Sequence, residues 1–244
     1  MNMYIEKYMN VIRIISFFLF MTCSSVETNL SVDETYQKLK NSLEKGNLRT
    51  SEEYLETLKN KDEDSKYFQD YLWLQGDLFF KKKEYAEAIY NYQLFLDLYP
   101  YNSEFENISW KIVLAYNKLI AHDSSRDISY CPTLNRFASK FVGIKPEAQV
   151  MIDKCHNFMA KKEYNLSKEY YRMNKKESSL NRLKYFFVLF KGVHIQPKIW
   201  DNALIFSLQS FGKKCEQFIQ YEPLEKNSKY HILKERCLKN MNNY

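Results

Sequence analysis

The stretch Leu72–Pro100, LWLQGDLFFKKKEYAEAIYNYQLFLDLYP, predicts two antiparallel helices packed closely together. Gly76 is followed by Ala88, Tyr92 and Pro100 at the offsets of positions 8, 20, 24 and 32 in a tetratricopeptide repeat, a helix–turn–helix unit of 34 residues. Two helices approach closely where one presents Gly76 and the other Ala88, and Pro100 stops the second helix because it lacks an N–H. An ordinary amphipathic hairpin is the alternative interpretation.

Weaker copies of this pattern extend in both directions along the chain. Asp33 is expected to cap a first helix, and in the third repeat an enlarged loop is expected between the two helices. The predicted helices are 34–45, one from about 50 or 51, one from about 109, 133–142, 147–173, 177–190, 198–210, 212–221 and a polar closing helix, 226–241. The predicted fold is therefore all-α, a tetratricopeptide-repeat solenoid of about five helix–turn–helix units.

Composition supports helices joined by short connections. Only 5 Gly and 5 Pro occur in 244 residues, which argues against a turn-rich β fold. The net charge is +6, and no Lys/Arg cluster is interleaved with aromatic residues in the way typical of a nucleic-acid-binding face. We therefore expect no nucleic-acid partner.

Residues 1–22 have the pattern of a lipoprotein signal peptide. A short apolar run, Ile14–Met21, follows basic residues and is too short to span a bilayer. It leads to Cys23, the expected lipidation site, although Thr22 stands where Gly, Ala or Ser is usual. A simple secretory signal and an uncleaved N-terminal anchor are the alternatives.

The predicted signal peptide indicates where the protein is located, and the repeats that follow it give the expected domain boundaries. Ser24 rather than Asp follows Cys23, which favours the outer membrane, with the protein anchored by its lipid on the periplasmic face. We expect a lipidated tether over residues 23–32. Repeats 1–3 are then expected over residues 33–146, and repeats 4–5 with the capping helix over residues 147–244.

The sequence offers no pattern typical of catalysis, metal binding or cofactor binding. The histidines are scattered, no phosphate-binding glycine loop is present, and the cysteines lack CxxC spacing, so we expect a non-enzymatic protein without cofactor or metal. In an oxidising compartment the four cysteines after Cys23 could pair, but we favour buried free thiols at helix packing positions. These residues are Cys131, Cys155, Cys215 and Cys237.

Three local patterns resemble the BamD family, also called YfiO or ComL, of lipoproteins in the outer-membrane β-barrel assembly (Bam) machinery. The first is QKLKNSLEKGNLRTS, residues 37–51, and the second is DSSRDISYCPTLNRFASKF, residues 123–141. The third is AKKEYNLSKEYYRMNKKESSLNRL, residues 160–183. Matching positions in the second and third are Asp123, Arg126, Asp127, Phe137, Phe141, Glu163, Tyr164, Tyr170, Asn181 and Arg182.

This resemblance implies an adaptor that assists insertion of β-barrel proteins into the outer membrane. Its C-terminal half would bind the periplasmic domain of the barrel-forming, BamA-like subunit, and its N-terminal repeats would receive a strand of unfolded outer-membrane proteins. Arg182 is carried over first as a partner-binding residue, followed by Glu163 and Tyr164. A guanidinium suits this role because it stays charged and can grip a carboxylate through two hydrogen bonds. A solvated surface arginine is the alternative for Arg182. Packing within the long helix is the alternative for Glu163 and Tyr164, and for Tyr164 we favour it.

Repeat geometry suggests a second site, a groove for an extended peptide. The first helix of each repeat lines the concave face, where aromatic residues can receive apolar side chains and Lys40 can meet a terminal carboxylate. Packing between repeats is the alternative for Trp73 and Tyr116. The groove candidates are Tyr36, Lys40, Asp70, Trp73, Asp77, Phe80, Ile112 and Tyr116.

Two other functions fit the same architecture. One is a generic periplasmic tetratricopeptide scaffold lipoprotein, which would lack affinity for the assembly subunit. The other is a cell-wall-acting enzyme on a helical superhelix, which would need an exposed carboxylate in a deep groove.

Overall fold

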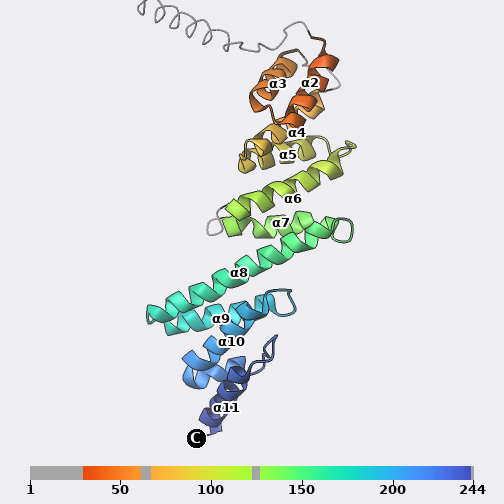
Figure 1. The fold of residues 1–244 in the computed structure, drawn as a ribbon. Coiled ribbons are helices and arrows are strands. Elements are labelled where there is room, and N and C mark those ends of the chain that lie inside the picture. The colour runs from red at the N-terminus through yellow and green to blue at the C-terminus, as the bar shows by residue number, and fades with distance from the viewer. Residues whose placement is uncertain (1–29, 62–66, 123–126, 243–244) are drawn as a thin grey trace, which may run out of the picture. The chain divides into compact units, whose positions relative to one another are not determined.

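The computed structural model describes residues 30–61, 67–122 and 127–242, and helices make up all the regular secondary structure of these ranges (Figure 1). The predicted sites at Cys23, Asp123 and Arg126 lie outside the described residues. The chain divides into two units, residues 1–82 and 83–244. In each unit, helices pack mainly against their neighbours in sequence, which confirms the predicted all-α solenoid of tetratricopeptide-like units.

Among its described residues, the first unit contains α2 (Val32–Lys45), α3 (Leu48–Lys61) and α4 (Phe68–Lys81). Ser31, rather than the predicted Asp33, caps α2. Its hydroxyl accepts from the Glu34 backbone N–H at 3.2 Å, while the Glu34 carboxylate accepts from the Ser31 N–H at 2.9 Å. This reciprocal capping box satisfies two backbone donors, which Asp33, one position inside the helix, cannot do.

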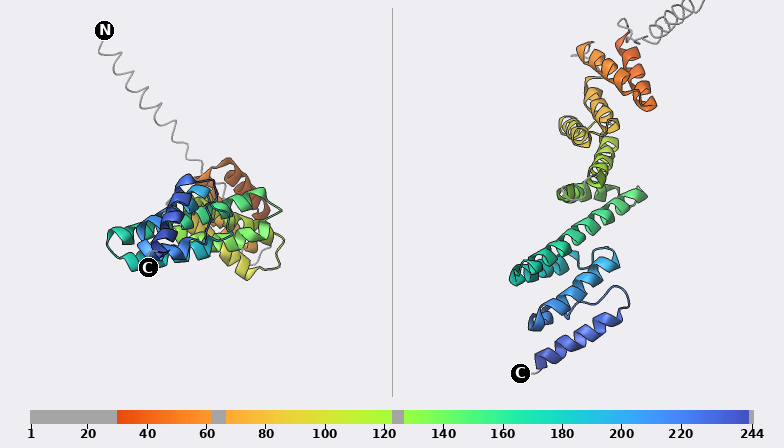
Figure 2. Two further views of the ribbon diagram at one scale, coloured as in Figure 1. Left: turned by 90° about the horizontal axis from the view of Figure 1, so that it is seen from below. Right: turned by 60° about the vertical axis from the view of Figure 1, so that its left-hand side comes forward.

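The second unit runs from α5 to α11. In its described residues, the α-helices are accompanied by three 3₁₀ segments, and α8 is a single continuous helix of 27 residues, seen in green in the right-hand view of Figure 2. The elements are α5 (Tyr85–Leu98), α6 (Phe105–His122), η1 (Asp127–Tyr130), α7 (Cys131–Ala138), η2 (Ser139–Phe141), α8 (Pro146–Arg172), α9 (Lys176–Phe190), α10 (Pro197–Ser210), η3 (Gly212–Phe218) and α11 (Ser228–Asn242).

Most predicted helix ends lie within a few residues of the observed ends, and the differences have local causes. α5 ends at Leu98, just before Tyr99-Pro100, as expected. The α8–α9 turn has Asn174 at φ 58°, the left-handed conformation that asparagine tolerates. α7 starts at Cys131, two residues earlier than predicted, because Pro132 fits the first helical turn. The predicted helix after Gly212 is a 3₁₀ segment ending at Phe218.

Small buried residues allow close helix packing inside both units. Between α8 and α9, the Ser179 hydroxyl donates to the Ser167 carbonyl at 2.7 Å, and both residues are fully buried. Between α2 and α3, the hydroxyls of Ser42 and Ser51 lie 2.7 Å apart. The predicted approach of Gly76 and Ala88 joins residues of different units and stays a prediction.

The four cysteines form two disulfides, so the expectation of buried free thiols is wrong. Cys131 at the start of α7 pairs with Cys155 on α8, with Cα atoms 5.4 Å apart. Cys215 in η3 pairs with Cys237 on α11, with Cα atoms 6.1 Å apart. Both distances suit a disulfide. The thiols are indeed buried, but helix packing brings them together in pairs, which spacing alone does not reveal.

Aromatic residues form much of the core of the second unit. The buried Phe187 ring stacks on Tyr221 at 4.5 Å and meets Trp200 edge-on at 5.0 Å. These contacts join α9 to α10 and to the segment after η3, so the core connects three consecutive parts of the chain. Within the described residues, none of the helices has the length and apolar character that a bilayer crossing requires.

Phe187→Ala should lower the free energy of unfolding by about 3–5 kcal/mol, because it leaves a cavity among four aromatic rings, those of Phe186, Trp200, Phe218 and Tyr221. Urea unfolding followed by circular dichroism measures this loss. The matched control is Val188→Ala on the next residue, which is 72% exposed and should change stability by less than about 0.5 kcal/mol. Equal effects of the two substitutions would contradict the described orientation of α9.

Replacing either cystine by two alanines should lower stability by about 3 kcal/mol, because cross-links closing similar loops restrict the unfolded chain to a similar degree. The sequence separations are 24 for Cys131–Cys155 and 22 for Cys215–Cys237. Urea unfolding of Cys131→Ala/Cys155→Ala and of Cys215→Ala/Cys237→Ala measures both losses. Unchanged stability together with four free thiols in the wild-type protein would contradict this pairing.

Candidate functional site

A surface depression of about 440 Å³ lies between α8 and α9 in the second unit. The two helices are antiparallel neighbours, so residues about twenty positions apart in sequence meet across the turn at Asn174. The depression is lined by Glu163, Tyr170, Ser178, Asn181, Arg182 and Tyr185. It therefore brings together four of the five residues in the third family-like pattern, Glu163, Tyr170, Asn181 and Arg182.

An ion pair between Glu163 and Arg182 crosses this depression. The Arg182 Nη1 donates to Glu163 Oε2 at 3.1 Å, and the side chains are 40% and 16% exposed respectively. This bond uses one of the five guanidinium N–H donors, so others on the exposed edge can bind an incoming carboxylate. An ion pair this exposed contributes at most about 1 kcal/mol to stability, so Arg182 is well placed for recognition at little cost to the fold.

Tyr164 is half-buried against the edge of the core and does not line the depression. Its ring meets Phe206 of α10 edge-on with centroids 6.2 Å apart, and Lys168 Nζ lies 5.3 Å from its ring centre. Burial raises the pKa of Tyr164 above its ordinary value. These contacts agree with the packing role favoured for Tyr164 and give no support to a direct partner contact.

Tyr185 is a site residue that the sequence predictions missed. It lies three residues after Arg182 on α9, which puts both on one helix face, and its side chain is 51% exposed. Val188, another three residues on, is 72% exposed. The i, i+3 spacing from Arg182 was the available signal. An apolar strip, Tyr185 and Val188, thus continues from the ion pair along α9.

A smaller pocket of about 180 Å³ shares Glu163 and Tyr185 with the depression. We call it the η1 pocket, because η1 and the start of α7 form one wall while α8 and α9 form the rest. Its lining combines apolar and aromatic side chains with polar and charged ones and comprises Ile128, Ser129, Pro132, Met159, Lys162, Glu163, Tyr185 and Leu189. The η1 pocket and the depression therefore adjoin on the same part of the second unit.

The second family-like pattern contributes packing residues. Phe141 is buried, and its ring centroid lies 5.1 Å from that of Trp110. Phe137 is half-buried, with Arg136 and Lys140 over its ring. Only the backbone of Asp127 is described, as the first residue of η1.

The groove candidates of the first unit include a polar–aromatic cluster. The Asp70 carboxylate accepts from the Tyr36 hydroxyl at 2.7 Å and from the Trp73 indole N–H at 3.0 Å. Tyr36 and Trp73 are buried, whereas Lys40, with Nζ 5.5 Å from the centre of the Tyr36 ring, is half-buried. The aromatic rings act here as packing residues, and the carboxylate already holds two donors.

The remaining groove candidates differ in exposure. Asp77 and Phe80, also in the first unit, are half-buried. In the second unit Ile112 and Tyr116 are buried, and the Tyr116 ring lies 5.8 Å from that of Tyr130. Burial raises the pKa of Tyr116. The burial of Trp73 and Tyr116 is what the packing alternative expects, and the peptide groove itself stays a prediction.

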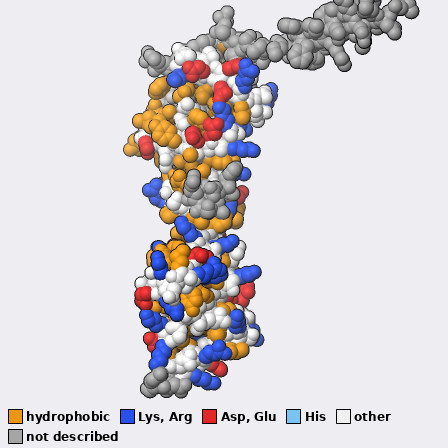
Figure 3. Space-filling model, turned by 90° about the vertical axis from the view of Figure 1, so that its left-hand side faces the viewer, with side chains coloured by type: hydrophobic (Ala, Val, Ile, Leu, Met, Phe, Trp, Pro, Cys, Tyr) orange, Lys and Arg blue, Asp and Glu red, His pale blue; other side chains and the backbone are white. Residues whose placement is uncertain are grey.

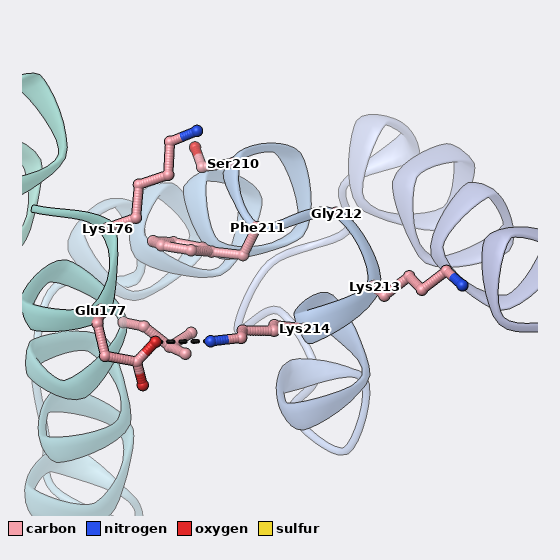
Figure 4. A pocket seen from close by; sticks show the side chains of 8 residues that line it. Lys176, Glu177, Ser210, Phe211, Gly212, Lys213 and Lys214 are labelled. Atoms are coloured by element: carbon pink, nitrogen blue, oxygen red, sulfur yellow. Dashed lines mark hydrogen bonds and ion pairs between the residues drawn. The ribbon is translucent and has the colours of Figure 1, made fainter. Parts of the chain in front are cut away.

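A further pocket of about 410 Å³ lies between the N-terminal end of α9 and the α10–η3 connection. Figure 4 shows Glu177 and Lys214 pointing toward each other, with their atoms 2.6 Å apart, while Lys176 and Lys213 point elsewhere. The lysines therefore do not converge on one anion. On the face drawn in Figure 3, basic side chains likewise lie among acidic and apolar ones.

Tyr164→Phe should change stability by less than about 0.5 kcal/mol and leave partner binding intact, because the ring contacts remain. Tyr164→Ala should cost about 2 kcal/mol through lost packing against Phe206. Urea unfolding and a partner pull-down measure the two effects. Loss of binding in Tyr164→Phe at unchanged stability would instead assign the hydroxyl to the partner contact.

Comparison with known proteins identifies the family of the chain. The family model YfiO, described as outer membrane lipoprotein, matches residues 28–200, from the segment before α2 into the start of α10. The matched region includes both helices that carry Glu163 and Arg182. A search of curated proteins found no significant match. Since the family model covers most of the sequence, the chain belongs to the YfiO family of outer membrane lipoproteins.

Proposed function

We propose that the protein is a lipid-anchored adaptor of the β-barrel assembly machinery, a BamD-like component that helps β-barrel proteins insert and fold in the outer membrane. In this proposal the lipid on Cys23 holds it on the periplasmic face of that membrane. The second unit binds the periplasmic domain of the BamA-like barrel-forming subunit through the surface around Arg182. The proposal is non-catalytic, and family membership supports it at the level of an outer membrane lipoprotein.

One observation carries the partner-binding part of the proposal. Four residues that match the family pattern, two on α8 and two on α9, line a single surface depression. Tyr164, the fifth residue of that pattern, packs at the edge of the core instead. A surface cluster of this kind is expected when a shared pattern reflects a shared contact as well as packing.

The chemistry of the depression fits a partner that offers a carboxylate beside an apolar side chain. Arg182 can form charge-assisted hydrogen bonds while it remains next to Glu163. Tyr185 and Val188 provide exposed apolar area beside it, and an aromatic residue next to an arginine is a common composition for the energetically dominant part of an interface. Glu163 orients the guanidinium before the partner arrives.

The N-terminal repeats are proposed to receive a strand of unfolded outer-membrane proteins. Lys40, half-buried beside the Tyr36 ring, is the residue proposed to meet a terminal carboxylate. The half-buried Phe80 offers apolar surface in the same unit. The buried rings of Tyr36 and Trp73 would support such a groove from beneath.

Arg182→Glu should abolish recovery of a large barrel protein with periplasmic domains when the lipidated protein is pulled down from detergent-solubilised membranes. The charge reversal removes the donor and places a second carboxylate beside Glu163. The matched control is Arg172→Glu, which breaks a similar pair with Glu169 on α8 and should leave recovery unchanged. If wild type recovers no such barrel protein, the generic scaffold becomes the better account.

A charge swap separates recognition from local structure. Glu163→Arg/Arg182→Glu restores an ion pair between α8 and α9 but moves the positive charge to the other helix. If Arg182 itself contacts the partner, the swapped protein should fold normally and still fail to bind. Full recovery of binding by the swap would show that only the ion pair matters and would demote Arg182 to a structural role.

A further inference from the structure

The η1 pocket has one wall with little secondary structure of its own. Ile128 and Ser129 belong to η1, a 3₁₀ segment of four residues, and Pro132 lies in the first turn of α7, a helix of eight residues. Such short segments are marginal by themselves, so tertiary contacts must hold this wall in place.

The Cys131–Cys155 disulfide joins this wall to α8, which forms another part of the pocket lining. Cys131 lies directly before Pro132 and three residues after Ile128. Cys155 lies on α8 four residues before Met159, which lines the pocket. Cys155 and Met159 therefore lie on the same face of that helix. The covalent bond therefore fixes η1 and the start of α7 against the part of α8 that leads to Glu163.

Noncovalent contacts also hold the wall. The Tyr130 and Tyr116 rings lie 5.8 Å apart, and the Asn135 amide nitrogen lies 3.1 Å from His156 Nε2. The disulfide has both cysteines buried and is the only side-chain cross-link between α7 and α8 that is covalent among the described residues. Its burial points to a permanent structural link, since a reductant cannot reach it while the fold is closed.

We propose that the Cys131–Cys155 disulfide is a positioning element of the partner-binding surface. It holds the η1 pocket open beside the Glu163–Arg182 ion pair, and the pocket receives an apolar side chain of the same partner that pairs with Arg182. This inference rests on the proposed function. It is supported by the continuity of the η1 pocket with the depression, which share Glu163 and Tyr185. A preformed pocket costs less to occupy than one that must order on binding.

The test measures binding of the purified full-length protein to the isolated periplasmic domains of the barrel-forming subunit from the same membranes, by calorimetry in detergent. Cys131→Ala/Cys155→Ala should raise Kd about tenfold, as expected if the wall is ordered in about a tenth of the molecules. Cys215→Ala/Cys237→Ala removes a cross-link of similar span in the same unit and should keep Kd within about twofold of wild type. Equal Kd values for wild type and Cys131→Ala/Cys155→Ala would overturn the proposal. Equal losses in both alanine pairs would overturn it too, because they would indicate general destabilisation.

A second variant tests the pocket with the disulfide intact. Ile128→Asp places a carboxylate in the lining and should raise Kd at least about tenfold, because burying that charge against the partner is unfavourable. Ile232→Asp on α11, where the isoleucine is 59% exposed, is the matched control and should bind as wild type does. Unchanged binding by Ile128→Asp would overturn the pocket's role.

The same titration separates the two proposals. If wild type does not bind the periplasmic domains, or binds them independently of Arg182, the proposed function fails and this inference fails with it. If binding is tight and lost in Arg182→Glu but insensitive to Ile128→Asp and to loss of the Cys131–Cys155 bond, only the positioning role is overturned.

Discussion

Close packing of antiparallel helices at small residues is the constraint on which the structure depends. Ser179 on α9 meets Ser167 on α8 through a buried hydrogen bond of 2.7 Å, and larger side chains at these positions would push the helices apart. Their separation of twelve residues repeats that of Gly76 and Ala88. This approach sets the register of α8 on α9, and the register decides which residues meet at the surface.

The register explains why the partner-binding surface lies where it does. With α8 and α9 packed through Ser167 and Ser179, Glu163 on one helix comes within hydrogen-bonding distance of Arg182 on the other. Tyr164, one residue along α8, turns toward α10 and packs on Phe206. A single hairpin thus supplies the partly exposed ion pair and, next to it, a half-buried ring that packs on the following helix.

The two disulfides reinforce segments that short helices alone would hold weakly. One joins η1 and α7 to α8, and the other joins η3 to α11. Disulfides persist in oxidising compartments, which agrees with membership in a family of outer membrane lipoproteins. Each disulfide stabilises a part of the chain that contains a 3₁₀ segment, and such segments make few internal hydrogen bonds.

The sequence by itself determined the helical class, most helix ends and the family, because small-residue spacing, proline stops and the turn at Asn174 act locally. It also supplied Arg182 and Glu163 as candidates. Only the tertiary structure decided that they pair and that Tyr185 joins them. Tertiary packing likewise buried Trp73 and Tyr116 and paired the four cysteines. These outcomes depend on contacts between distant parts of the chain, and sequence spacing records which residues share a helix face but not which helix that face meets.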